Sequence, residues 1–65
     1  MVQIEFSLRV AQKAMEAIND NRFLKENIGE TSTNSIEFDE EFLQEILDAL
    51  ELWGISEDEF TVEIK

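Results

Sequence analysis

The sequence predicts an α+β domain in which two helices pack on one face of a small, mostly antiparallel sheet. Apolar residues alternate with polar ones near the start, the middle and the end of the chain, which predicts strands. Two longer stretches repeat apolar residues every three or four positions, which predicts helices. The expected order is β-α-β-β-α-β, the split-βαβ or ferredoxin-like arrangement, with a three-stranded β-α-β-α-β sheet as the fallback.

The first strand and helix are predicted from residues 2–20. In "VQIEF", Val2, Ile4 and Phe6 share one face, as in a half-buried strand. Ser7 is the expected N-cap, whose hydroxyl accepts a hydrogen bond from a free backbone amide. The helix follows over residues 8–20, because one stripe collects the apolar residues Leu8, Val10, Ala11, Ala14, Met15, Ala17 and Ile18. Asparagine at 19 and 21 suits the helix end, since it tolerates the left-handed conformation.

The middle of the chain is the least regular part of the pattern. Phe23 and Leu24 fall out of phase with the first helical stripe, so "RFLKENI" at 22–28 is predicted as a short strand. The fallback topology applies if this strand does not form. "GETSTN" at 29–34 has the composition of a loop.

The second half repeats the pattern. Ile36 and Phe38 predict a strand, Asp39 is the expected helix N-cap, and Gly54 is the expected residue just past the helix end. The helical stripe between them contains Phe42, Ile46, Ala49, Leu50 and Trp53, and Leu43 and Leu47 flank it. A last strand contains Phe60, Val62 and Ile64.

A shift of 32 residues aligns the two halves, placing Ile4-Glu5-Phe6 over Ile36-Glu37-Phe38. We therefore interpret residues 1–65 as a single domain with pseudo-repeat halves at 2–28 and 34–64. A chain of this size buries only about 60% of the surface that its unfolded form exposes, so its stability is expected to be small.

The acidic residues are distributed unevenly. The net charge is −11, and residues 34–65 contain eleven acids and one base, whereas residues 1–33 contain five acids and four bases. Such a surface repels phosphate backbones and anionic membranes, so we expect no direct nucleic-acid or membrane binding. Basic protein surfaces are the expected partners. The alternative is that the charge serves only solubility.

Enzymatic chemistry is not indicated. The chain has no histidine and no cysteine, which removes the commonest general base, the thiol nucleophile and the usual zinc ligands. The acids fall on polar faces or in loops rather than in a desolvated pocket. We expect no catalytic residue, no metal and no cofactor. The first residues do not resemble a signal peptide and no apolar run spans a bilayer, so a cytoplasmic location is expected.

The predicted second helix concentrates acids on one face. At 100° per residue, an arc of about 140° contains Glu40, Glu41, Gln44, Glu45, Asp48 and Glu51. The uncovered sheet face is expected to carry Gln3, Glu5, Ser35, Glu37, Thr61 and Glu63. Trp53 is interpreted either as core or as an interface anchor. Phe23 and Leu52 are apolar residues on otherwise polar faces.

Two hypotheses follow. The first is a small, non-enzymatic, acidic protein-binding module: an inhibitor that occupies the basic, nucleic-acid-binding surface of a partner by charge mimicry, in the manner of a DNA mimic. Its predicted partner-binding residues are Glu37, Glu41, Glu45, Asp48, Glu51, Glu63 and Trp53. The second is a structural homodimer, homo-oligomer or complex subunit whose acidity is only solubilising.

Overall fold

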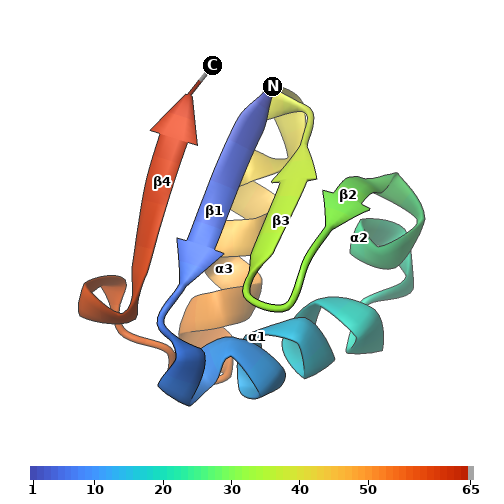
Figure 1. Cartoon of the computed structure of the whole chain (residues 1–65). Helices are drawn as coiled ribbons and strands as arrows, with labels where there is room; N and C mark the ends of the chain where they lie inside the picture. Colours follow the sequence, from blue (N-terminus) through green and yellow to red (C-terminus); the bar gives the residue numbers. More distant parts are fainter. Residues whose placement is uncertain (65) are drawn as a thin grey trace.

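The computed structural model describes residues 1–64, which form a four-stranded antiparallel sheet covered on one face by helices (Figure 1). The helices and strands follow the order β-α-α-β-β-α-β, with two short 3-10 helices, η1 and η2. Their bounds are β1 Val2–Phe6, α1 Leu8–Asp20, α2 Arg22–Asn27, β2 Ile28–Thr31, β3 Ser35–Phe38, η1 Glu40–Phe42, α3 Leu43–Leu52, η2 Glu57–Glu59 and β4 Phe60–Ile64. The predicted class, a small α+β domain built on an antiparallel sheet, is confirmed.

The strands lie in the order β2-β3-β1-β4, and each neighbouring pair is antiparallel. β1 is central, and its register places Ile4 opposite both Ile36 in β3 and Val62 in β4. Ile4 and Ile36 are also residues that the shift of 32 superimposes. The division into halves 2–28 and 34–64 stays a prediction.

Residues 22–28 do not form the predicted strand, because Arg22–Asn27 form the helix α2. The side chain of Asn21 accepts a hydrogen bond from the Leu24 amide at 3.2 Å, which is an N-cap contact. Leu24 is also the one buried residue of this segment, whereas a half-buried strand would bury alternate side chains. Asn21 thus ends α1 and begins α2, and it does so with an extended backbone rather than the left-handed one expected.

The second strand lies where the sequence predicted a loop. β2 is short, exposed at most positions and irregular in its register with β3 between Ile28 and Thr31. At Gly29 a Cβ atom would lie 3.2 Å from the Glu37 carbonyl oxygen, so glycine suits the close approach of the two strands. β2 provides a fourth strand, and the three-stranded fallback is wrong. The extra helix α2 means that the predicted β-α-β-β-α-β order is met only in part.

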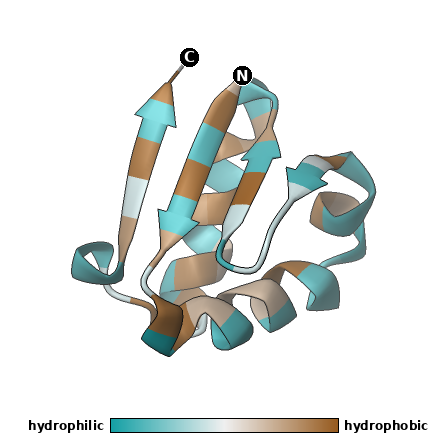
Figure 2. Ribbon diagram, in the orientation of Figure 1, coloured by the Kyte–Doolittle hydropathy of each residue, from teal (hydrophilic) through white to brown (hydrophobic). Residues whose placement is uncertain are grey.

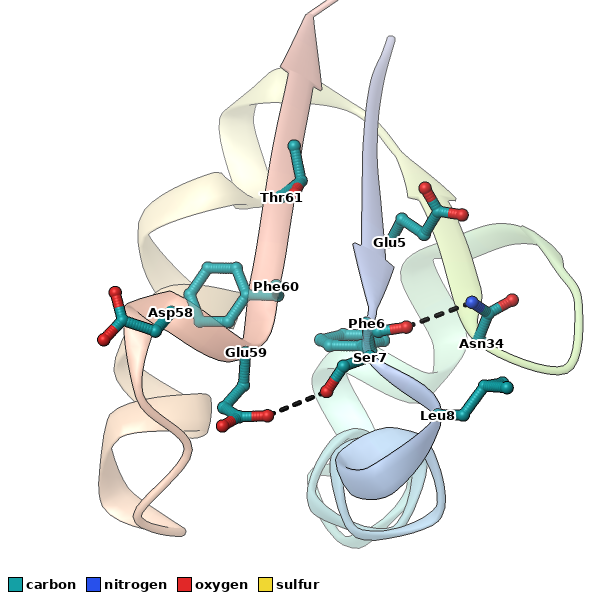
Figure 3. Close-up of a pocket in the computed structure, with 9 residues that line it drawn as sticks. All are labelled: Glu5, Phe6, Ser7, Leu8, Asn34, Asp58, Glu59, Phe60 and Thr61. Atoms are coloured by element: carbon teal, nitrogen blue, oxygen red, sulfur yellow. Dashed lines mark hydrogen bonds between the residues drawn. The ribbon is translucent and has the colours of Figure 1, made fainter.

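The core lies between the helices and one face of the sheet. Hydrophobic and hydrophilic residues alternate along β1, β3 and β4 in Figure 2, in agreement with the predicted period of two. The core cluster consists of Val2, Ile4, Phe6, Ala11, Ala14, Ile18, Leu24, Ile36, Phe38, Ile46, Leu50 and Ile55. Leu8 was predicted in the buried stripe of α1, but this is wrong, since it is 75% exposed. It is the first residue of the helix, and its side chain points outward in Figure 3.

The helix predicted after Asp39 begins as the 3-10 helix η1 rather than as an α-helix, and it ends as the sequence predicts. Asp39 accepts a hydrogen bond from the Glu41 amide at 3.3 Å and precedes η1, which continues into α3. Gly54 has a φ of 77°. The amides of Gly54 and Ile55 donate to the carbonyls of Glu51 and Leu50, each at 2.9 Å, which is a Schellman motif. No helix among residues 1–64 has the length and apolar character needed to cross a membrane.

We predict that Gly54→Ala lowers the free energy of unfolding by about 1–2 kcal/mol, because an L-residue is strained at this positive φ. Packing contributes little to this loss, since the new Cβ would meet only Lys13 Nζ at 3.9 Å. Gly54→Asn should lose less, since asparagine tolerates this conformation. Urea denaturation measures both; an alanine variant as stable as the parent would contradict the prediction.

Candidate protein-binding surface

The acidic residues predicted on the second helix lie together on one exposed face. We call the acidic face the set of exposed carboxylates of η1 and α3: Glu40, Glu41, Glu45, Asp48 and Glu51. The opposite side of α3 is fixed to the core by Ile46 and Leu50, both at 0% exposure. The carboxylates therefore project from an anchored helix rather than from a flexible segment.

The ion pairs of residues 1–64 involve carboxylates outside the acidic face. The two ion pairs within this range join Arg9 to Glu59 and Arg22 to Glu26, the latter at 3.5 Å. Lys13 Nζ lies beside Gly54 at the carboxyl end of α3, where a cation is favourable to the helix dipole. Within the described part of the chain, no lysine or arginine is ion-paired with a carboxylate of the acidic face.

Two other predicted residues lie on a different surface. Glu37 and Glu63 are each opposite Gln3 in the register, one on either side of β1. Two strand spacings separate them, or about 9.5 Å. Since their side chains occupy the sheet face away from the helices, the structure does not bring them together with Glu41, Glu45, Asp48 and Glu51.

The sequence left Trp53 open as core or as an interface anchor, and the anchor role stays a prediction. Its side chain is partly buried against the core cluster, and it also lines a groove of about 530 Å³. Phe23 and Leu52, which are 53% and 85% exposed, line the same groove. The Phe23 ring is held edge-to-face against Phe42 at a centroid distance of 5.4 Å. We call this feature the Trp53 groove.

The Trp53 groove could not be recognised from the sequence, although its apolar residues were noted. One wall is the junction of α1 and α2 at residues 20–23, and the other is a stripe of α3. Residues 22–28 were predicted as a strand, which would have carried Phe23 into the sheet. Its juxtaposition with Leu52 and Trp53 depends on the tertiary packing of α2.

A second cavity, of about 340 Å³, lies between the start of α1 and the start of β4 (Figure 3). The Ser7 hydroxyl donates to Glu59 Oε2 at 2.8 Å, and the Ser7 amide donates to the Glu59 carbonyl at 2.8 Å. Arg9 forms an ion pair with the same carboxylate. On the other side, the Asn34 side chain donates to the Phe6 carbonyl at 3.0 Å. These contacts tie the end of β1 to the segments that precede β3 and β4.

The role of Ser7 differs from the prediction. It precedes α1 with the extended backbone of an N-cap, but its hydroxyl makes no capping hydrogen bond to the helix. The hydroxyl is directed toward Glu59 instead. The Ser7–Glu59 contact is thus a link between distant segments of the fold. Residues 1–64 bring together no group of three or more side chains suited to holding a metal ion.

Comparison with family models, with curated proteins and with solved structures gives no match to this chain. The interpretation of its surfaces therefore depends on their own chemistry and geometry.

We predict that Glu59→Gln lowers the free energy of unfolding by about 1 kcal/mol, because it removes the charge shared by Ser7 and Arg9. Glu57→Gln is the matched control, since it removes the same charge from the same 3-10 helix at an exposed position. The control should be neutral or slightly stabilising, because it only reduces repulsion in an acidic protein. Equal effects in urea denaturation would show that the Glu59 contacts contribute nothing.

Proposed function

We propose that this chain is a small, non-enzymatic protein-binding module that uses the acidic face to occupy a basic surface of a partner. The partner we favour is a nucleic-acid-binding protein, whose phosphate-binding side chains the carboxylates would engage. The protein would then act as an inhibitor by charge mimicry. The observation that carries this proposal is the anchored helix α3, whose exposed acids have no ion pair with the cations of residues 1–64.

The spacing of the carboxylates supports this mechanism. From Glu41 in η1 to Glu51 in α3 the chain rises about 15 Å along the helix axis, and four acids at positions 41, 45, 48 and 51 share this length. That is one charge per roughly 4–5 Å of helix axis, compared with one phosphate per about 3.4 Å of duplex axis for each DNA strand. Because α3 is fixed at Ile46 and Leu50, little conformational entropy is lost when the charges meet a partner.

We predict that the double substitution Glu45→Lys/Asp48→Lys weakens binding to a nucleic-acid-binding partner at least tenfold and makes the affinity less dependent on salt. Binding is measured against a panel of purified DNA- and RNA-binding proteins at rising salt, with DNA as competitor.

The matched control is Glu16→Lys/Glu30→Lys, which makes the same change of net charge at exposed positions outside the acidic face. It should weaken binding only a few fold through the overall charge. Equal losses in the two double variants, or binding by none of the panel, would contradict charge mimicry by this face.

A second candidate function is a homo-oligomer or complex subunit that pairs through β4. β4 is an edge strand, and a free edge invites pairing with another strand. Val62 and Ile64 lie opposite the buried Ile4 and Val2, yet they are 38% and 63% exposed. A second copy would cover them, but it would bring two strongly acidic chains together.

Sedimentation at micromolar concentration separates the two candidates. Charge mimicry by a monomer predicts one species of 7.6 kDa in low and high salt. Pairing through β4 predicts a dimer that strengthens as salt screens repulsion and that is lost in Ile64→Lys. A dimer unaffected by Ile64→Lys would contradict the β4 interface.

We also propose that the scaffold is a split-βαβ, ferredoxin-like arrangement with α2 added between α1 and β2. The strand order and the antiparallel pairs support it, because each of the two β-α-β crossovers skips one strand. We also propose a cytoplasmic location, where the partner that we favour, a nucleic-acid-binding protein, would be met.

A further inference from the structure

We propose that the Trp53 groove is the docking site for a cationic amphipathic helix of the partner protein. This inference rests on the proposed function and specifies it: the partner would present apolar side chains flanked by lysine or arginine, not basic charge alone. Phe23 and Leu52 are exposed apolar residues from distant parts of the sequence, and both line one groove beside Trp53.

The shape of the groove favours a helix. Its α3 wall contains residues 45, 48, 49 and 52, at the spacing i, i+3, i+4 and i+7 that makes one stripe of a helix. The stripe spans eight residues, or about 12 Å. Two turns of a partner helix have nearly the same length, and the helix-in-groove mode of recognition uses apolar anchors at this spacing.

The acidic residues at the rim of the groove favour a partner segment with positive charge. Asp20, Glu45 and Asp48 line the groove, and the one cation there, Arg22, is joined to Glu26. A second copy of this chain would present acids to acids. A partner with lysine or arginine next to its apolar anchors would instead pair with the carboxylates of the rim while it covers Leu52 and Phe23.

The acidic face and the groove form one continuous stripe. On a helix of 100° per residue, positions 41, 45, 48 and 52 lie within about 60° of one another. Leu52, the most exposed large apolar residue described, therefore ends the row of carboxylates formed by Glu41, Glu45 and Asp48. A partner helix lying along α3 would meet both at once, so its affinity would have a salt-dependent and a salt-independent part.

The test uses two synthetic helical peptides with the same number and positions of lysines. One carries leucine at i, i+3, i+4 and i+7, and the other carries alanine there. Binding is followed by Trp53 fluorescence and by NMR shifts of the backbone amides. We expect the leucine peptide to bind at least tenfold more tightly than the alanine peptide, which is about 1.4 kcal/mol, with the largest shifts at residues 20–23 and 45–53.

Leu52→Ser should remove most of this difference and leave the binding of the alanine peptide unchanged. Leu8→Ser is the matched control, since Leu8 is 75% exposed and lines the other cavity. Because both leucines are exposed, neither variant should unfold the domain, and urea denaturation verifies this.

Equal affinities for the two peptides, no binding of the leucine peptide, or equal effects of Leu52→Ser and Leu8→Ser would overturn the groove proposal. If the two peptides bind equally and Glu45→Lys/Asp48→Lys weakens both, the groove fails while charge mimicry stands. If the leucine peptide binds in the groove but no panel protein binds the acidic face, the groove stands and mimicry of nucleic acid fails.

Discussion

The arrangement of the acidic residues depends on the burial of Ile46 and Leu50, which lie on the inner side of α3. Both side chains are at 0% exposure and pack with residues of β1 and β3 in one core cluster. Without this burial, the repulsion among Glu41, Glu45 and Asp48 would favour an unfolded segment, since like charges at this spacing destabilise a helix. Full burial of an isoleucine or leucine contributes about 1.5–3 kcal/mol, which exceeds the few tenths lost to each repulsive pair.

Specific polar contacts also hold distant segments of this small fold together. The Ser7–Glu59 and Asn34–Phe6 hydrogen bonds join segments that are distant in sequence. The edge-to-face contact of Phe6 with Phe60, at a centroid distance of 6.2 Å, places β4 beside β1 at the same end. A chain of 65 residues has a small core, so each such contact is a larger fraction of its total stability.

Much of the scaffold is predictable from the sequence because its signals are local. Each local pattern predicts one structure. The alternation predicts β1, β3 and β4, the apolar stripe predicts α1, and Gly54 predicts the end of α3. α2 and β2 are not predictable in this way. α2 buries one residue, Leu24, so it has no apolar stripe to reveal it. Asn21 is both the C-cap of α1 and the N-cap of α2. β2 is an exposed edge strand with an irregular register, whose residues resemble a loop. The shared face of the acids in α3 can be predicted from the helical period. The Trp53 groove cannot, because it forms only where α2 packs near α3.

The most direct measurement of whether α3 holds its carboxylates in a fixed pattern is hydrogen exchange of its backbone amides, followed by NMR at low and high salt. We predict that the amides of residues 46–50 exchange as slowly as those of β1, in both 20 mM and 500 mM salt (conditions of about 20 Å and 4 Å screening length). Rapid exchange in α3 at low salt, while β1 remains protected, would contradict a rigid acidic surface.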